Sequence, residues 1–315
     1  MPNNIKTWLD FALQQMAAES YLDDINLQNL TLVRGRLLDG NNDTRIIQPD
    51  ENDNLPGKTR FTNQLADRFL STYHIVDQHA DDASGFSATL MSYVENGVTK
   101  YTLSFRSTEY QLQADGGDRE RDGASGADGE LSGDGFAFGQ LAAMEQYYAD
   151  LKQGKKSDGT IDSTLQDFFN DPTHQISVTG YSLGGHLAAA FTELHTEEVN
   201  HTYLYNAPGR GEFTVNPDLG IAGTLTAMIQ YYSDVLEDPS HGWDPSYADD
   251  PDLQTAFNVA NNVNGPINDT DLYQDPREHW AVLATARKYV TSFPIFSTTG
   301  LGADADSCIL DMSFQ

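Results

Sequence analysis

A serine flanked by glycines lies within the segment ISVTGYSLGGHLAAAF, residues 176–191. Gly180 and Gly184 stand two positions before and after Ser182, which gives the pattern G-x-S-x-G. Glycines at these positions remove the β-carbons that would collide where a strand turns sharply into a helix. Such a turn holds the serine hydroxyl clear of its neighbours and aims free helix N–H groups at an oxyanion beside it. The pattern therefore predicts that Ser182 is a nucleophile.

The flanking residues predict the elements that such a turn requires. Residues 176–179 are β-branched and alternating, which predicts a strand, and the alanine-rich residues 187–194 predict a helix. A glycine-rich turn with an incidental serine is the alternative interpretation of so short a motif. The strand, the helix and the additional Gly185 favour the nucleophile, because they supply the structural context of the motif.

A serine nucleophile needs a histidine to accept its proton and a carboxylate to orient that histidine. In folds that carry this kind of turn, the chain order is serine, acid, histidine. Asp234 closes the apolar segment 223–234, and we expect a strand there to bring its carboxylate to the same edge as Ser182. Asp238 is the nearest rival, with Asp244 behind it.

His279 is the expected base, because it begins a predicted closing helix at 277–293 and follows every candidate acid. His241 is the competitor, although it lies only a short way beyond Asp234. His186 is close to the serine but precedes the acids, so we expect it to have a structural role.

An oxyanion hole needs the N–H of the residue after the nucleophile and a second N–H from another segment. The residue after the nucleophile is Leu183. The second donor is expected from LSFRSTEY, residues 103–110, where an apolar strand ends abruptly in polar residues.

Composition limits the class of protein. The chain has 315 residues, which is enough for one α/β domain, and a formal charge of −29. That charge repels phosphate backbones, so a nucleic-acid partner is not expected, and it suits a salty or calcium-rich medium. Cys308 is the one cysteine, so an internal disulfide is excluded.

The first residues, 1–22, predict an amphipathic helix without the basic start or unbroken apolar core of a secretory signal. No apolar run is long enough for a transmembrane segment. We therefore expect a protein that stays in the cytoplasm or leaves the cell without an N-terminal signal peptide.

The order of predicted elements indicates an α/β fold. We expect a single domain over 1–315, with an N-terminal helical segment (1–80) and a mostly parallel sheet covered by helices on both faces. The individual predictions are a helix at 60–79, two strands around Asn96-Gly97 within 85–110, an exposed acidic loop at 115–135, helices at 136–151 and 164–169, and strands at 199–209 and 223–234.

Two of these motifs resemble those of a known family. FRST (105–108), the helix from 136, and VTGYSLGG (178–185) are similar to the class 3 lipase branch of the α/β-hydrolases. The segment GYSLGGHLA (180–188) also resembles bacterial lipase and phospholipase catalytic domains that are exported with calcium-binding repeats. Ser107 stands where the family usually has glycine, and Tyr181 where it usually has histidine. The site residues that the resemblance implies are Ser182, Asp234 and His279 for the triad, and Thr108 and Leu183 for the oxyanion hole.

The resemblance implies a serine carboxylic-ester hydrolase that acts on lipid acyl esters, as a lipase or phospholipase A1, through an acyl-enzyme. Its partners would be a lipid or small ester and, transiently, a lipid interface, and it would be secreted. A non-catalytic binding module with the hydrolase fold and an acyltransferase with the same triad are the alternatives.

The chemistry itself needs no cofactor, but acidic residues between the expected acid and base are suited to a structural Ca²⁺ ion. The loop at 115–135 stands where the resembled lipases often carry a lid, and the alternative is a solvated loop without a role. The candidate calcium ligands are Asp244, Asp269, Asp271 and Asp275.

Overall fold

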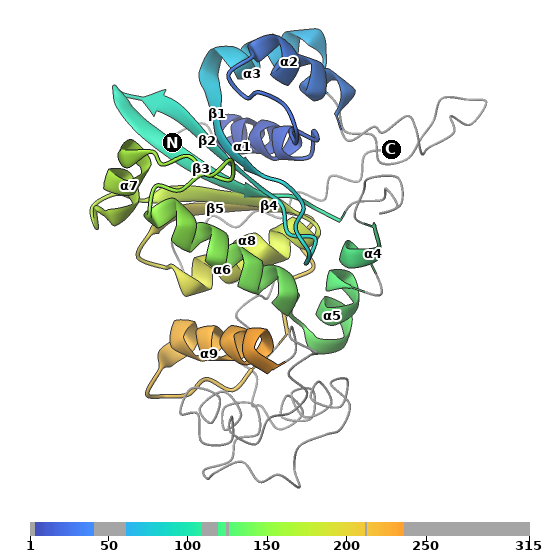
Figure 1. Ribbon diagram of the computed structural model, residues 1–315, viewed down its shortest axis with the longest axis vertical. Coiled ribbons are helices and arrows are strands. Elements are labelled where there is room, and N and C mark those ends of the chain that lie inside the picture. The colour runs from blue at the N-terminus through green and yellow to red at the C-terminus, as the bar shows by residue number, and fades with distance from the viewer. Residues whose placement is uncertain (1–3, 41–60, 109–118, 124–125, 212, 236–315) are drawn as a thin grey trace, which may run out of the picture.

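A five-stranded sheet forms the centre of the molecule, in the order β1-β2-β3-β4-β5 (Figure 1). The computed structural model describes residues 4–40, 61–108, 119–123, 126–211 and 213–235. The strands are β1 (Tyr73–His79), β2 (Ala88–Glu95), β3 (Val98–Phe105), β4 (Ile176–Tyr181) and β5 (Val199–Tyr205).

The sheet is mixed, so the expectation of a mostly parallel sheet is wrong for the strands β1 to β3. β1, β2 and β3 pair antiparallel, whereas β3, β4 and β5 pair parallel. Short connections join the first three strands, and a short connection can only return the chain antiparallel. The α/β class itself is confirmed.

The turn between β2 and β3 confirms the predicted hairpin. Asn96 has φ 52° and Gly97 has φ 78°. A two-residue turn of this type needs positive φ at both positions, which asparagine and glycine tolerate best.

Helices cover both faces of the sheet, as predicted (Figure 1). One face carries α1 (Asn4–Ala18), with α2 (Leu30–Asp39) and α3 (Asn63–Thr72) beside it. The opposite face carries α6 (Phe138–Lys152), α7 (Ser163–Asn170) and α8 (Leu183–Leu194), which share the larger apolar core with the sheet. The predictions at 136–151, 164–169 and 199–209 are thus confirmed as α6, α7 and β5.

The predicted helix at 60–79 is half wrong, because the chain changes from α3 to β1 at Tyr73. Tyr73 and Ile75 are buried while His74 between them is exposed, so the alternation of a strand begins there. The apolar spacing before residue 73 fits a helix, and the β-branched and aromatic residues after it favour a strand.

The predicted strand at 223–234 is wrong, because these residues lie in a helix, α9 (Gly220–Val235). Leu225, Met228 and Ile229 are buried at helical spacing in the core shared with α6 and α8. Asp234 therefore lies in the last turn of a helix and does not end a strand.

The acidic segment at 115–135 is not simply an exposed loop, since it contains α4 (Arg119–Asp122) and α5 (Ala127–Asp134). Asp122 is 3% exposed and accepts a hydrogen bond from Gln140 Nε2 at 2.6 Å. Arg121 donates to the carbonyl of Asp82, and Ala127 is buried. Side chains of this glycine-rich segment anchor it to the body of the fold.

Candidate active site

The backbone at Ser182 has an unusual conformation. Ser182 separates the end of β4 from the start of α8, with φ 50° and ψ −122°. A positive φ at a residue with a side chain costs on the order of 1–3 kcal/mol and persists only where the surroundings enforce it. Here the Ser182 N–H donates to the Tyr205 carbonyl at 3.0 Å, and the Ser182 carbonyl accepts from Gly185 and His186. The turn is thus fixed on both sides of the serine.

Glycines make this turn possible by removing β-carbons. A β-carbon on Gly180 would lie 2.0 Å from the carbonyl oxygen of Gly184, and one on Gly184 would lie 2.3 Å from that of Phe105. Gly185 faces Ala207, where a β-carbon would lie 2.6 Å from the alanine methyl. The first turn of α8 therefore packs backbone to backbone against the end of β3.

Two parallel strands bring the predicted oxyanion segment to the serine. Phe105 at the end of β3 is paired in register with Gly180 of β4. Thr108 and Ser182 follow these residues at the same edge of the sheet. Leu183 begins α8, and the first N–H groups of a helix have no acceptor within it. The structure thus brings Ser182, Leu183 and Thr108 to one edge of the sheet.

Helix α5 borders this edge, which the sequence did not indicate. Leu183 is 1% exposed and packs with Ala127 and Ala137, with Leu131 beside them. Thr108 Oγ1 lies 3.1 Å from the nearer carboxylate oxygen of Asp128, at the start of α5. Burial raises the pKa of Asp128, and the hydrogen bond from Thr108 opposes that rise.

His186 has a structural role, because both its ring nitrogens are used within the fold. Its Nδ1 lies 2.9 Å from the Gly209 carbonyl, and its Nε2 accepts from the Ala137 N–H at 3.2 Å. The ring is fully buried, and this burial lowers the pKa of His186 to about 4. A neutral ring with Nδ1–H satisfies both contacts and joins α8 to the start of α6 and the loop after β5.

We expect His186 to make the protein less stable in acid. The unfolded chain binds a proton near pH 6.5 and the folded chain only near pH 4. Stability is therefore lost as the pH falls between these values, by about 3 kcal/mol in total. Urea unfolding at pH 7 and pH 4 should show a larger loss for the wild type than for His186→Gln, whose amide can make both hydrogen bonds. Equal losses in the two proteins would contradict this role.

The rest of the predicted site is not placed. Asp234 lies in α9, and no side-chain position is described for it. His279 and the alternatives Asp238 and His241 lie outside the described residues, as do the candidate calcium ligands Asp244, Asp269, Asp271 and Asp275. Within the described ranges, no group of three or more histidine, cysteine, aspartate or glutamate side chains is arranged to hold a metal ion.

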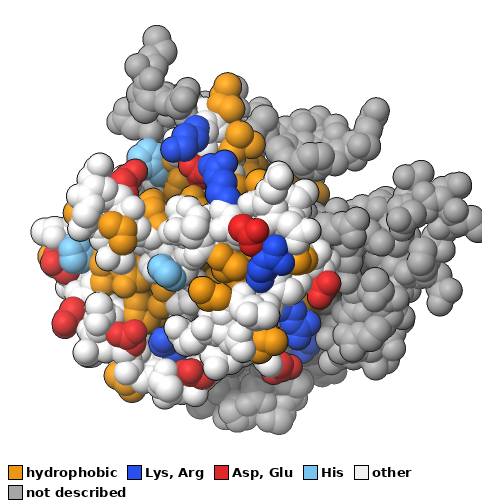
Figure 2. Space-filling view, turned by 90° about the horizontal axis from the view of Figure 1, so that it is seen from above, with side chains coloured by type: hydrophobic (Ala, Val, Ile, Leu, Met, Phe, Trp, Pro, Cys, Tyr) orange, Lys and Arg blue, Asp and Glu red, His pale blue; other side chains and the backbone are white. Residues whose placement is uncertain are grey.

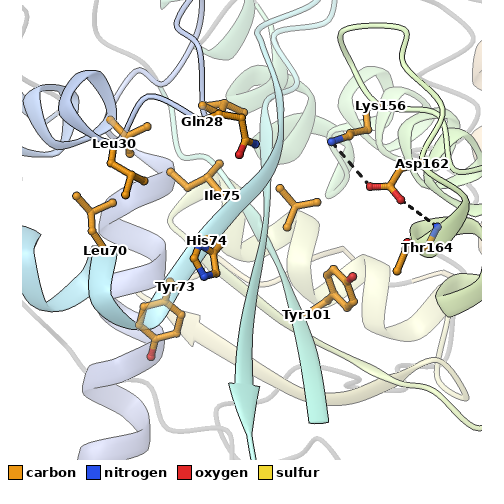
Figure 3. Close-up of a pocket in the computed structure, with 13 residues that line it drawn as sticks. Gln28, Leu30, Leu70, Tyr73, His74, Ile75, Tyr101, Lys156, Asp162 and Thr164 are labelled. Carbon is orange, nitrogen blue, oxygen red and sulfur yellow. Dashed lines mark hydrogen bonds and ion pairs between the residues drawn. The ribbon is translucent and has the colours of Figure 1, made fainter. Parts of the chain in front are cut away.

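Two cavities lie beside β1, which is an edge strand of the sheet. The smaller, of about 320 Å³, has Leu30 and Leu70 on one side and the ion pair of Lys156 and Asp162 on the other (Figure 3). The larger, of about 700 Å³, lies between the turn after α1 and residues 155–159. Neither is lined by Ser182, Leu183 or Thr108, so neither is the place for a substrate of Ser182.

Among the helices that the structure describes, none combines the length and the apolar character needed to cross a membrane. The face shown in Figure 2 carries acidic and basic side chains among apolar and polar ones.

No protein-family model matches the chain, and no curated protein or solved structure is significantly similar to it.

Proposed function

We propose that this protein is a serine hydrolase of carboxylic esters, with Ser182 as its nucleophile. The observation that carries the proposal is the backbone of Ser182, held at φ 50° and ψ −122° between a strand and a helix. A fold tolerates such a conformation where it is needed, and presenting a nucleophile to a substrate is a reason to keep it.

The proposed reaction has two steps. Ser182 Oγ attacks the ester carbonyl while His279 removes its proton, and the N–H groups of Leu183 and Thr108 stabilise the oxyanion. Collapse of this intermediate releases the alcohol, which takes the proton from His279, and leaves the acyl group on Ser182. Water then attacks the acyl-enzyme in the same way and releases the acid.

Acyl esters of lipids are the proposed substrates. Leu131 is half-buried where it packs against the buried Leu183 and Ala127, and Tyr181 before the serine is 38% exposed. Apolar surface next to a nucleophile favours a substrate with an acyl chain over a charged one.

The test is hydrolysis of p-nitrophenyl esters of increasing chain length, beside a phospholipid whose released fatty acid is measured. We expect hydrolysis that rises with acyl length beyond acetate and is lost in Ser182→Ala. Parallel reactions with Ca²⁺ and with a chelator test the calcium proposal, which fails if chelation changes neither the rate nor the melting temperature. No hydrolysis of any ester would overturn the proposed function.

The triad acid is proposed to lie at or just after the end of α9, as Asp234 or Asp238. The sequence favours Asp234 because it would end a predicted strand, but these residues form the helix α9. Asp234 and Asp238 are therefore equal candidates. We expect one of Asp234→Asn and Asp238→Asn to lower kcat about 10⁴-fold, because the histidine then loses its orienting carboxylate. The other variant serves as the matched control and should keep kcat within a few fold. Two active variants would exclude both residues.

A further inference from the structure

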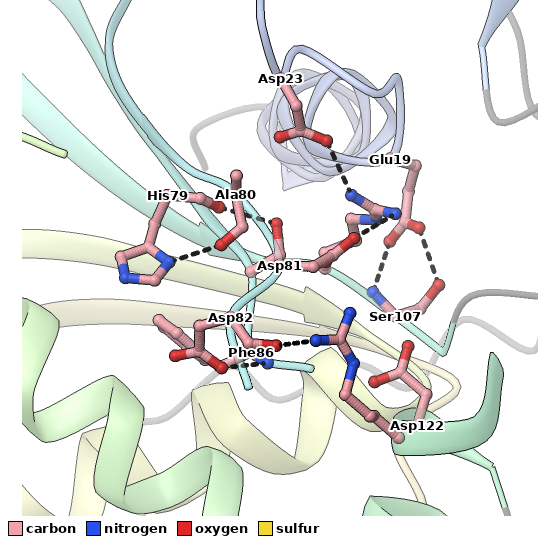
Figure 4. Close-up of polar contacts among 12 residues, drawn as sticks. Glu19, Asp23, His79, Ala80, Asp81, Asp82, Phe86, Ser107 and Asp122 are labelled. Carbon is pink, nitrogen blue, oxygen red and sulfur yellow. Dashed lines mark hydrogen bonds and ion pairs between the residues drawn. The ribbon is translucent and has the colours of Figure 1, made fainter. Parts of the chain in front are cut away.

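Glu19 contacts the predicted oxyanion segment from the far end of helix α1. It follows the last residue of that helix and is 7% exposed. Its Oε1 accepts the backbone N–H of Ser107 at 3.0 Å, and its Oε2 accepts the Ser107 hydroxyl at 2.7 Å (Figure 4). One buried carboxylate thus holds both the backbone and the side chain of Ser107.

Gln15, one helical turn earlier, extends this contact along β3. Its Nε2 donates to Glu19 Oε1 at 2.8 Å and to the Phe105 carbonyl at 2.9 Å. Its Oε1 accepts the Ser104 hydroxyl at 2.8 Å. The buried side chains of Gln15 and Glu19 therefore join the end of α1 to β3 at residues 104 and 105, and to the segment after β3 at residue 107.

Arg106 is held by the turn that follows α1. Its guanidinium lies 3.5 Å from Asp23 and 3.5 Å from Asp81 (Figure 4). It also lies 4.5 Å from the ring centre of Tyr21. Tyr21 and Asp24 have φ 42° and 58°. Left-handed conformations at residues other than glycine cost about 1–2 kcal/mol each, so the contacts of this turn must offset its strain.

We propose that Glu19 is a positioning residue for the oxyanion hole: by holding Ser107, it aims the backbone N–H of Thr108 at the oxyanion formed on Ser182. The proposal rests on the proposed function. Glu19 accepts the N–H of Ser107, the residue directly before Thr108, while Asp128 of α5 holds the Thr108 side chain.

The same contact explains why serine can stand where the resembled lipases have glycine. A hydroxyl that is partly withdrawn from water needs a hydrogen-bond partner, and Glu19 Oε2 supplies it for Ser107. Glu19 and Ser107 act as a pair, although 88 positions separate them in the sequence.

The test measures kcat and KM for p-nitrophenyl butyrate, and the affinity for a boronic acid that adds to the serine as a tetrahedral anion. Glu19→Ala should lower kcat about 30-fold, less than the loss of a whole donor, and leave KM within about twofold. The same variant should weaken boronate binding by a similar factor, because kcat and boronate affinity both depend on the same oxyanion contacts. Glu19→Gln should keep kcat and boronate affinity within about threefold of the wild type. Its amide can keep the hydrogen bonds to Gln15 and to the N–H and hydroxyl of Ser107.

The matched control is Asp77, another buried carboxylate that accepts the N–H and hydroxyl of one serine, Ser157, and the hydroxyl of Tyr147. It lies in β1, away from Ser182. Asp77→Ala should lose stability and keep kcat and boronate affinity. If Glu19→Ala does not fold, Glu19→Asp is measured instead. Its carboxylate is one methylene too short to reach Ser107, and we expect kcat to fall about tenfold, because an oxyanion donor is displaced.

The outcomes separate the two proposals. If the wild type hydrolyses the ester and the folded Glu19 variant matches its kcat, the role of Glu19 is overturned and the proposed function stands. The same holds if Asp77→Ala lowers kcat and boronate affinity as strongly as Glu19→Ala. If the wild type hydrolyses no ester, the function fails and the role of Glu19 fails with it.

Discussion

Ser182→Ala should lower kcat/KM for the preferred ester by a factor of about 10⁴ or more, because the reaction loses the group to which the acyl chain is transferred. The variant should fold as the wild type does, and relief of the positive φ is not expected, since alanine also has a β-carbon. Steady-state rates on the best ester of the series check the effect, with the melting temperature measured alongside.

Ser177→Ala is the matched control for that variant, because Ser177 is a buried serine of β4, the strand that leads to Ser182. It should keep kcat/KM within a few fold. A Ser182→Ala protein within tenfold of the wild type would overturn the mechanism.

Gly184→Ala should destabilise the fold and abolish activity together. Its β-carbon would lie 2.3 Å from the carbonyl oxygen of Phe105 and 2.6 Å from that of Arg106. These are backbone atoms, so α8 and β3 must separate, and we expect a loss of about 3 kcal/mol in the free energy of unfolding, at the upper end of overpacking effects. Activity falls as well, because the same displacement moves Thr108 away from Ser182. Urea unfolding and ester hydrolysis measure the two effects.

Gly35→Ala is the control for a glycine in a helix, because its added β-carbon in α2 would meet no described residue within 4 Å apart from the chain neighbours and the backbone of its own helix. It should stabilise the protein by up to about 1 kcal/mol through helix propensity and leave the rate unchanged. If Gly184→Ala were as stable and as active as Gly35→Ala, the close contact between α8 and β3 would be wrong.

Local patterns in the sequence were sufficient for the turn around Ser182 and for the hairpin at Asn96-Gly97. In both cases the backbone conformation selects particular residues within a few positions, so the sequence carries the signal directly. The pattern of apolar and polar residues was less decisive in distinguishing helices from strands. Residues 223–234 are apolar and rich in residues that suit either element, and only their burial against α6 and α8 decides for a helix.

Contacts between distant segments could not be predicted from these patterns. Glu19 and Asp128 contact residues 107 and 108 across 88 and 20 positions of the chain. The spacing of Gln15 and Glu19 by one helical turn was visible in the sequence, but burial of both side chains depends on the sheet that α1 covers. Composition also misled at 119–134, where glycine and acidic residues suggested a solvated loop and the structure has two helices.

Labelling with a fluorophosphonate tests most directly whether Ser182 is an activated nucleophile, because the probe reacts with activated serines whatever the natural ester. The intact wild-type protein should gain one probe per chain, on the proteolytic peptide that contains Ser182, and Ser182→Ala should gain none. A wild-type protein that remains unlabelled, or that carries the probe on another residue, would contradict the proposed function.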